Sequence, residues 1–273
     1  MGFFSFRDGA LFVHHTLDEH PSSGDFSMHA HECYELFYFD KGSAVFWVEG
    51  TPYPLLPGDM MLFNVSEAHK IELQSDAPYE RTAVHFSGEL AQAMDPSGAL
   101  LHPFCSRPLG KGNLLHPDDF KDDYWRQCLK NIVADAADRR LQIVTNLLPL
   151  LNEIRAAFDN HQHRLTPNPD YISSQILEYV NANICEALTP DGVAARFFIS
   201  KSRLYTIFKQ ATGLTVWNYI TVKRLLRARQ LLAAGQTPTA VATACGFRDY
   251  TVFFRAYKKK YGVSPRRDYC KRP

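Results

Sequence analysis

Histidine and acidic side chains near the start of the chain have the composition of a metal site. His29, His31, Cys33 and Glu35 stand at alternate positions, and a further histidine follows at His69. Because a β-strand points alternate residues to one face, the first four side chains are predicted to point together into the interior of a β-domain. Imidazoles combined with a carboxylate suit a divalent transition metal that keeps open coordination positions. Metal binding is therefore the first chemistry that the sequence indicates.

Basic residues dominate the second chemically distinctive region, in the C-terminal part of the chain. Residues 1–163 contain 12 Lys/Arg against 23 Asp/Glu, whereas residues 164–273 contain 18 against 6, although the net charge of the whole chain is only +1. A basic surface binds a polyanion because each cation placed against a phosphate releases condensed counterions. Charge alone leaves open that the basic half docks on the acidic half.

Short β-rich segments with turn residues between them occupy the first hundred residues. They are Leu11–His14, Tyr34–Phe39, Ala44–Val48, Met60–Phe63, Lys70–Leu73 and Arg81–Phe86. Glycine, proline and aspartate separate them, as in Leu56-Pro57-Gly58-Asp59. Regularly spaced short strands of this kind favour a barrel or a sandwich.

The hydrophobic period changes to that of helices between Asp118 and Phe158. The apolar residues at 3–4-residue intervals are Ile132, Val133, Ile143, Val144, Leu147, Leu148, Leu151 and Ile154. They predict a helical hairpin, whose apolar stripe fits either a partner helix or its own barrel. Two prolines then mark residues 161–169 as a linker.

A repeat with an offset of 49 residues follows the linker. Ala195, Phe198, Lys209 and Gly213 recur as Ala244, Phe247, Lys258 and Gly262. Each copy has the pattern of two helices with a tight turn: Pro190–Arg196 with Ser200–Thr212, and Pro238–Cys245 with Asp249–Tyr261. This is the pattern of a helix-turn-helix, with Val216–Ala233 as a connecting helix about 27 Å long.

The segment GFRDYTVFFRAYKKKYGVSP (246–265) resembles the signature of the AraC/XylS family of transcription regulators, and KRLLRARQLL (223–232) is similar to that family's linker helix. The resemblance covers about residues 171–269. One departure is the end, where Pro265-Arg266-Arg267-Asp268-Tyr269 replaces the usual Pro-x-x-Tyr-Arg. The resemblance implies that two recognition helices bind neighbouring segments of the DNA major groove.

Base-reading and phosphate-binding residues follow from this resemblance together with the 3–4 spacing of a helix face. The predicted base-facing residues are Ser202, Tyr205 and Thr206 in the first unit and Tyr250, Thr251 and Arg255 in the second. Lys201, Arg203, Lys209, Lys258 and Lys259 are predicted to bind phosphates. For Arg255, a phosphate clamp or a helix-packing salt bridge is the alternative. Leu204, Phe208, Phe253 and Tyr257 fall on the opposite face and are predicted to be core.

The histidine region resembles the two metal motifs of the cupin barrel, which implies the ligands His29, His31, Glu35 and His69. Gly24 stands one residue nearer His29 than that pattern expects, and Asn64 and Ser66 replace its Pro and Gly. AraC-type sensor barrels often use these positions for a sugar or another small effector without a metal. Effector contact, metal ligation and structural hydrogen bonding are therefore all open. The predicted effector-binding residues are His29, His31, Glu35, Phe37, Trp47 and His69.

Composition excludes several classes of protein. No signal peptide and no run of about 20 apolar residues is present, so a cytoplasmic protein without a membrane segment is expected. The six cysteines, at 33, 105, 128, 185, 245 and 270, include no C-x-x-C pair, which argues against a zinc ribbon or a thioredoxin-like site.

Together these features predict an α+β protein of several parts. The expected parts are a cupin-like β-domain (1–117), a helical hairpin for dimerisation (118–160), the linker (161–169) and an all-α domain of two helix-turn-helix units (170–273). The predicted function is sequence-specific regulation of transcription under control of a small effector, without enzymatic activity. The expected partners are promoter DNA, the effector, a second copy of the chain and RNA polymerase. Two alternatives are a metal-dependent cupin oxygenase or isomerase tethered to DNA, and an architectural DNA-binding protein.

Overall fold

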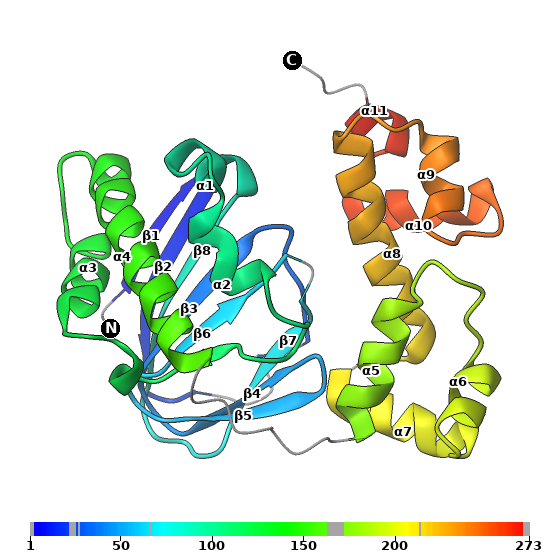
Figure 1. Ribbon diagram of the computed structural model, residues 1–273, viewed down its shortest axis with the longest axis horizontal. Coiled ribbons are helices and arrows are strands. Elements are labelled where there is room, and N and C mark those ends of the chain that lie inside the picture. Colours follow the sequence, from blue (N-terminus) through cyan, green and yellow to red (C-terminus); the bar gives the residue numbers. More distant parts are fainter. Residues whose placement is uncertain are drawn as a thin grey trace. The chain divides into compact units, whose positions relative to one another are not determined.

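The computed structural model describes residues 3–21, 26, 28–65, 67–162, 172–212 and 214–269, and gives only the backbone of residues 161 and 162. The chain forms two compact units, Met1–Asp170 and Tyr171–Pro273 (Figure 1). Most of the predicted linker lies outside the described residues, as do Gly24, Ser66 and Gly213.

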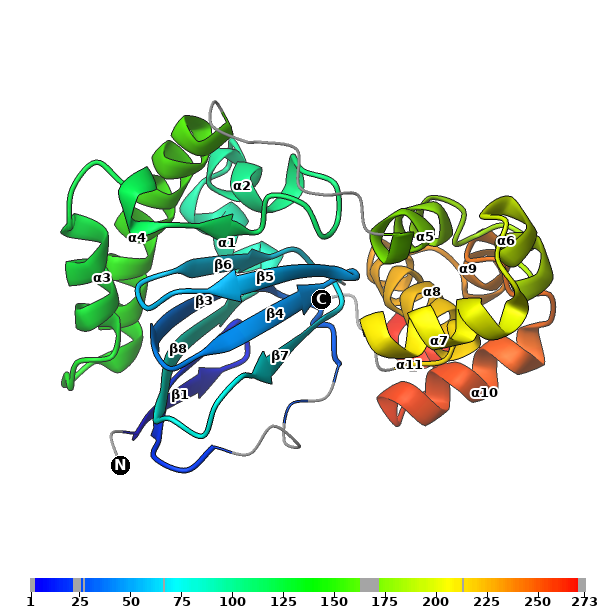
Figure 2. The ribbon, with the colours of Figure 1, turned by 90° about the horizontal axis from the view of Figure 1, so that it is seen from below.

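Two antiparallel sheets form the centre of the N-terminal unit. The strands are β1 (Phe3–Asp8), β2 (Leu11–Asp18), β3 (Tyr34–Lys41), β4 (Ala44–Val48), β5 (Thr51–Leu55), β6 (Met60–Phe63), β7 (His69–Leu73), β8 (Tyr79–Phe86) and β9 (Leu114–Leu115). One sheet has the order β1-β2-β8-β3-β6-β9 and the other the order β5-β4-β7. Figure 2 shows β4, β5 and β7 on the side of the larger sheet that faces away from the helices.

Alternation along the strands gives the larger sheet two different faces. On β8, Val84 and Phe86 belong to the core shared with the helices, whereas Ala83 belongs to the core between the two sheets. On β3, Leu36 and Phe37 are divided between the same two cores. Because successive side chains point to opposite faces, each central strand supports the helical layer and lines the space between the sheets.

Helices cover the outer face of the larger sheet. They are α1 (Gly88–Met94), η2 (Ala99–Leu101), α2 (His102–Cys105), η3 (Pro117–Asp119), α3 (Tyr124–Ile132) and α4 (Arg139–Gln162). Most of the predicted apolar stripe on α4, including Ile143, Leu147 and Ile154, is fully buried against its own unit. Leu141 and Leu148 are 59% and 42% exposed, so that only a narrow apolar strip remains for a partner.

The C-terminal unit consists of helices. They are α5 (Ile172–Ala182), α6 (Pro190–Arg196), α7 (Lys201–Thr212), α8 (Val216–Ala233), α9 (Pro238–Ala244), α10 (Tyr250–Tyr261) and α11 (Pro265–Tyr269). Figure 1 shows α8 joining one helix group, α5 to α7, to another, α9 to α11. The predicted α+β fold, with an N-terminal β-domain and an all-α C-terminal domain, is thus confirmed.

Capping residues define the two helix-turn-helix units. Thr189 and Thr237 accept hydrogen bonds at the N-termini of α6 and α9, each followed by a proline in the first turn. Ser200 and Asp249 accept from N–H groups of α7 and α10, as the sequence predicted. Thus both units begin their helices with the expected side-chain acceptors.

The turn of the second helix-turn-helix unit is one residue longer than that of the first. The uniform offset of 49 residues predicted from the sequence is therefore wrong before this turn, where the offset is 48. Ile199 N–H donates to Ala194 O, and Phe247 N–H donates to Ala242 O, so Phe247 corresponds to Ile199. Phe198 instead takes the place of Gly246, and both have positive φ, 54° and 77°. This left-handed position follows the end of a helix and normally favours glycine. Phe198 is 95% exposed, so burial of its side chain contributes little that offsets the strain.

Three strands were not predicted, and β5 has a clear physical reason. Pro52 and Pro54 lie within it, and proline cannot donate to a β-ladder. The strand is tolerated because it is at the edge of the smaller sheet, paired only with β4. Among the helices of the described residues, none is both long and apolar enough to cross a membrane.

Replacing Phe198 by glycine should stabilise the C-terminal unit. Glycine removes a left-handed strain of about 1–2 kcal/mol and increases the entropy of the unfolded chain by somewhat less, so a net gain of about 0.5–1 kcal/mol is expected. Thermal denaturation followed by circular dichroism measures it as a higher Tm.

Gly246→Ala is the matched control at the equivalent position and should act in the opposite direction. A Cβ atom there would lie 2.4 Å from Cys185 O, so the loop before α6 would have to move. If Phe198→Gly lowers the Tm, the Phe198 side chain contributes contacts that outweigh its strained backbone.

Candidate functional site

A cavity of about 380 Å³ lies between the two sheets of the N-terminal unit. Its lining residues come from six strands, β1, β2, β3, β4, β7 and β8, and from the segment before β3. They are Arg7, Phe12, His14, Phe26, His29, His31, Cys33, Glu35, Phe37, Phe46, His69, Ile71, Tyr79, Arg81, Ala83 and His85. This volume is within the range of small-molecule sites, and the walls are mainly aromatic with a few polar groups, as is typical of ligand pockets.

Four predicted residues meet in this cavity. Glu35 Oε2 lies 3.1 Å from His31 Nε2 and 3.2 Å from His69 Nε2. His29 joins them through a β-bridge to His69, with ring centroids 4.5 Å apart. Alternation therefore correctly predicted that these side chains point to one side, although His29 and His31 precede the regular strand β3, which begins at Tyr34.

The contact between Glu35 and His69 requires a positive species. His69 Nδ1 is 2.8 Å from Glu67 O, and since a carbonyl only accepts, Nδ1 must donate its proton there. In the neutral imidazole Nε2 then carries a lone pair, which faces the Glu35 carboxylate. The two atoms do not have hydrogen-bond geometry in the described structure, and neither does His31 Nε2. Two sets of ligand atoms lie close enough together to hold one metal ion: those of His29, His31 and His69, and those of His31, Glu35 and His85.

Burial keeps the imidazoles of His14 and His85 uncharged at neutral pH. It lowers the pKa of His85 to about 4, against the opposing attraction of Glu35. Burial also lowers the pKa of His14, with a further contribution from the Arg81 guanidinium. Although burial alone would raise the pKa of Glu35, the imidazoles of His31 and His69 hold it well below its usual range. The pocket thus presents a carboxylate together with the neutral imidazoles of His14 and His85, and both kinds of group can bind a metal at neutral pH.

Sequence reasoning missed His14, Tyr79, Arg81 and His85, all of which line the cavity. Alternation along β8 was the available signal, because Tyr79, Arg81 and His85 share the face of Ala83. The prediction for Trp47 is wrong. Its indole donates to Glu72 Oε2 at 3.1 Å on the opposite face of β4, and Phe46 lines the cavity instead.

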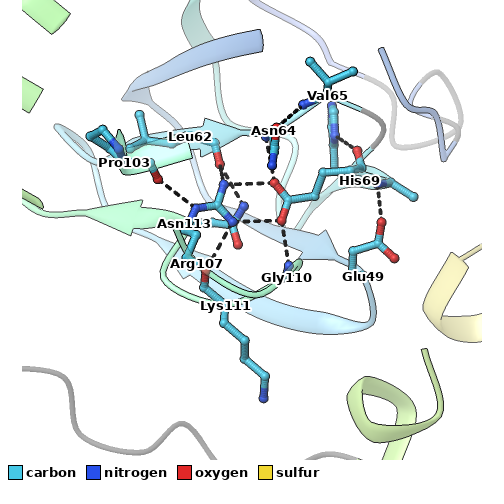
Figure 3. A network of polar contacts seen from close by, with 12 residues as sticks. Glu49, Leu62, Asn64, Val65, His69, Pro103, Arg107, Gly110, Lys111 and Asn113 are labelled. Carbon is cyan, nitrogen blue, oxygen red and sulfur yellow. Dashed lines mark hydrogen bonds and ion pairs between the residues drawn. The ribbon is translucent and has the colours of Figure 1, made fainter. Parts of the chain in front are cut away.

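A buried ion pair fixes the wall that carries His69. Arg107 NH1 and NH2 each lie 2.9 Å from an oxygen of Glu67, and both side chains are almost fully buried. The remaining donors of Arg107 bind the carbonyls of Pro103, Leu62 and Lys111 (Figure 3). This network attaches the 106–113 loop to the turn before β7, and so orients the histidine that follows Glu67 by two residues.

A second candidate surface lies on α7 in the C-terminal unit. Ser202, Tyr205 and Thr206 are exposed on one face, whereas Leu204 and Phe208 are fully buried on the other. The basic residues Lys201, Arg203 and Lys209 are exposed around this face. Lys201 makes an ion pair with Asp191 at 2.7 Å, which any phosphate contact would have to replace.

The corresponding surface on α10 has the same division. Tyr250, Thr251, Arg255, Lys258 and Lys259 are exposed, and Phe253 and Tyr257 are buried. Arg255 has no ion pair with a carboxylate among the residues that the structure describes; its Nε lies 3.5 Å from Thr251 O. Val252, which was not among the predicted residues, is 52% exposed beside them and suits contact with a thymine methyl group.

Arg224 on α8 connects the two helix-turn-helix units. Its guanidinium donates to Ile184 O, Glu186 O and Gly246 O, each at 2.7 Å. The first two carbonyls precede α6 and the third belongs to the turn before α10. This single buried side chain therefore fixes the loop of one unit against the turn of the other.

Two paired helix-turn-helix units together with a separate pocketed β-domain define a DNA-binding transcription regulator with a ligand-binding domain. Comparisons with known proteins agree. The model of the AraC-like ligand binding domain matches residues 16–150, and a helix-turn-helix domain model matches residues 193–268. The chain belongs to the AraC/XylS family of transcription regulators.

Two relatives named as transcriptional activators match this chain over nearly its whole length. The transcriptional activator RhaS of Escherichia fergusonii is 25% identical over 92% of this chain and 90% of its own length. RhaS of Yersinia pseudotuberculosis is 26% identical over 92% of both chains. Among solved structures, ToxT of Vibrio cholerae covers 94% of both chains, with 13% identity and a TM-score of 0.40.

Removing Arg107 should destabilise the N-terminal unit strongly. Arg107→Met leaves the buried Glu67 carboxylate unpaired, with an expected loss of about 3–5 kcal/mol in the free energy of unfolding. Burial by itself raises the pKa of Glu67. The ion pair with Arg107 and hydrogen bonds from two backbone N–H groups lower it by more, so the pKa of Glu67 lies below its usual value. That stabilisation is present above the ordinary Glu pKa of 4.5 and is lost as pH falls through the native value. The difference from wild type should therefore shrink in acid.

Denaturant unfolding across pH measures this effect. The double variant Arg107→Met/Glu67→Gln should recover part of the loss, because it removes the uncompensated charge. Arg139→Met breaks an exposed pair with Asp135 and serves as the control, with a change below about 1 kcal/mol. A loss in Arg107→Met that is equal at all pH values would contradict an origin in the Glu67 charge.

Proposed function

We propose that this protein is an effector-controlled transcription activator, which binds promoter DNA through α7 and α10 and senses a small molecule in the N-terminal cavity. The observation that carries the proposal is the presence of two exposed polar recognition faces on a helical unit, in a chain that also has a pocket of about 380 Å³ with unpartnered polar atoms. The relatives named as transcriptional activators support activation as the direction of control.

Each recognition face combines base reading with phosphate binding. We assign base contacts to Ser202, Tyr205 and Thr206 on α7 and to Tyr250, Thr251 and Arg255 on α10. Lys201, Arg203, Lys209, Lys258 and Lys259 bind phosphates. The planar guanidinium of Arg255, which makes no ion pair with a carboxylate among the described residues, can make a bidentate contact to guanine.

Effector control requires that the small molecule bind one arrangement of the protein more tightly than another. The cavity walls come from both sheets, so a ligand between them alters the packing of strands whose other faces support the helical layer. We propose a sugar or related small metabolite as the effector, in contact with His29, His31, Glu35, Phe37 and His69. Such a response needs binding of the effector but no catalytic step, so we favour it over the tethered cupin enzyme. We expect the protein to act in the cytoplasm.

Dimerisation is proposed through α4. Leu141 and Leu148 are exposed and stand seven residues apart, so they lie on one helical face and can pack against the same pair in a second copy. A dimer would present four recognition helices to paired half-sites, from which contact with RNA polymerase can activate transcription.

The cavity is proposed to hold a divalent transition metal through His31, Glu35 and His69, with His29 as a fourth ligand. The convergence of Glu35 Oε2 with two imidazole nitrogens that lack hydrogen-bond geometry supports this. A metal bound there would supply an open coordination position for an oxygen atom of the effector.

Capture of genomic DNA fragments by the purified protein at about 150 mM salt tests the proposed function. Wild type should recover a few discrete upstream sites. Arg255→Ala should lose about 1–3 kcal/mol of discrimination and relax the recovered sequence at one base position. Lys259→Ala is the matched contrast, since loss of a phosphate contact should weaken all sites alike and reduce the salt dependence by about one charge. Recovery of random fragments by the wild type would contradict sequence-specific recognition and favour an architectural protein.

Metal content measured by mass spectrometry after dialysis against Zn²⁺, Ni²⁺ or Mn²⁺ tests the metal site. About one equivalent is expected in wild type and in the control His102→Ala, whose imidazole is half-exposed on α2. His31→Ala and Glu35→Gln should bind at least about tenfold more weakly. Equal metal content in all four proteins would show that the metal binds elsewhere, and no metal in any of them would leave these residues a purely effector-binding or structural role.

A further inference from the structure

The cavity contains a second group of unpartnered polar atoms beside the histidine cluster. Tyr79 and Arg81 on β8 and His14 on β2 all line the cavity. Tyr79 OH, Arg81 NH1 and His14 Nδ1 are buried and have no hydrogen-bond partner within the described parts of the chain. Buried polar groups nearly always have a partner, so three such atoms in one cavity indicate a missing ligand.

Arg81 is held in place by aromatic rings rather than by an acid. Its guanidinium lies 4.4 Å from the centre of the Tyr79 ring and 5.4 Å from that of Phe26. The neighbouring carboxylate, Glu80, points to the opposite face of β8 and lies 3.3 Å from His15. No carboxylate in the described parts of the chain lies within ion-pair distance of Arg81. A half-buried guanidinium without a counter-ion attracts an anion strongly, because the low dielectric around it weakens screening.

We propose that the effector carries a carboxylate group, which binds Arg81 and Tyr79 at this end of the cavity. The inference rests on the proposed function and specifies the chemical class of its effector. Arginine and a carboxylate form parallel hydrogen bonds, and the Tyr79 hydroxyl donates a third to the same group. Depending on its tautomer, His14 Nδ1 can donate a hydrogen bond to an oxygen of the ligand or accept one from a ligand hydroxyl group beside the carboxylate.

The remaining walls determine the body of the ligand. Phe12, Phe37, Phe46 and Ile71 line the space beyond the polar groups, so that a compact ring fits better than a long polar chain. Arg81 and His85 are four residues apart on the same face of β8, about 13 Å along the strand. His14 lies between the two, with its ring 6.0 Å from that of His85, so a carboxylate bound at Arg81 and Tyr79 would lie beside the histidine cluster in the same cavity.

Matched pairs of acids and their amides test the inference on the full-length protein. Benzoate is compared with benzamide, and D-glucuronate with D-glucuronamide, by thermal shift and isothermal titration calorimetry. At least one acid should raise the Tm of wild type while its amide does not, because each pair differs mainly in charge. The acid should bind at least about tenfold more weakly to Arg81→Gln and about fivefold more weakly to Tyr79→Phe.

Two controls separate recognition from folding. Tyr79→Phe keeps the ring that stacks on Arg81 and removes only the hydroxyl, so it remains informative if Arg81→Gln folds poorly. Arg155→Gln, on α4, removes an arginine outside this cavity and should bind the acids as wild type does.

Three results would overturn the inference. They are equal shifts with acids and amides, no shift with either acid, and acid binding that survives Arg81→Gln but disappears after dialysis against EDTA. The last would assign the carboxylate to a metal at the histidines. Specific promoter capture alongside any of these results would leave the proposed function intact and reject only the acidic effector.

Discussion

The buried pair of Glu67 and Arg107 is the constraint on which the sensor pocket depends. Two opposite charges removed from water are tolerated only when every donor and acceptor is satisfied, and here backbone groups complete both side chains. One consequence is local, since the carbonyl of Glu67 fixes the tautomer of His69. The other is longer-range, because the same pair attaches the 106–113 loop to the sheet. A wall of the cavity is thus rigid before any ligand binds.

Arg224 has the corresponding role in the helical unit. A guanidinium that donates to three backbone carbonyls restrains the loop before α6 and the turn at Gly246 at the same time. Glycine is favoured at position 246 for two reasons: the backbone has a positive φ, and Cys185 O lies where a Cβ atom would be. The spacing of the two recognition helices therefore depends on one buried polar contact as well as on the length of α8. Phe198 shows that the equivalent position in the first unit lacks that close contact and tolerates a bulky residue.

Chemically, the cavity has two unlike groups of polar atoms without partners. In the first, a carboxylate lies close to two imidazole nitrogens, an arrangement that either a proton or a metal cation between them would stabilise. In the second, a guanidinium and a phenol lack an acceptor, which favours an anion. Aromatic side chains around both groups lower the local polarity and strengthen these electrostatic interactions. The acidic effector and the metal ion that we propose would together satisfy both groups.

The sequence by itself determined the α+β class, the helix-turn-helix units, the DNA-facing residues as exposed positions, and four of the polar residues in the cavity. These follow from local periodicity, capping residues and family motifs, which need no knowledge of distant contacts. Tertiary structure alone decided that β8 contributes Arg81 and His85, that Trp47 faces outward, and that β5 forms a strand despite two prolines. Each depends on which strands become neighbours and which become edges. Such pairings join residues far apart in the chain. Alternation along β8 indicates which of its residues share a face, but not which strands lie beside it or which cavity that face lines.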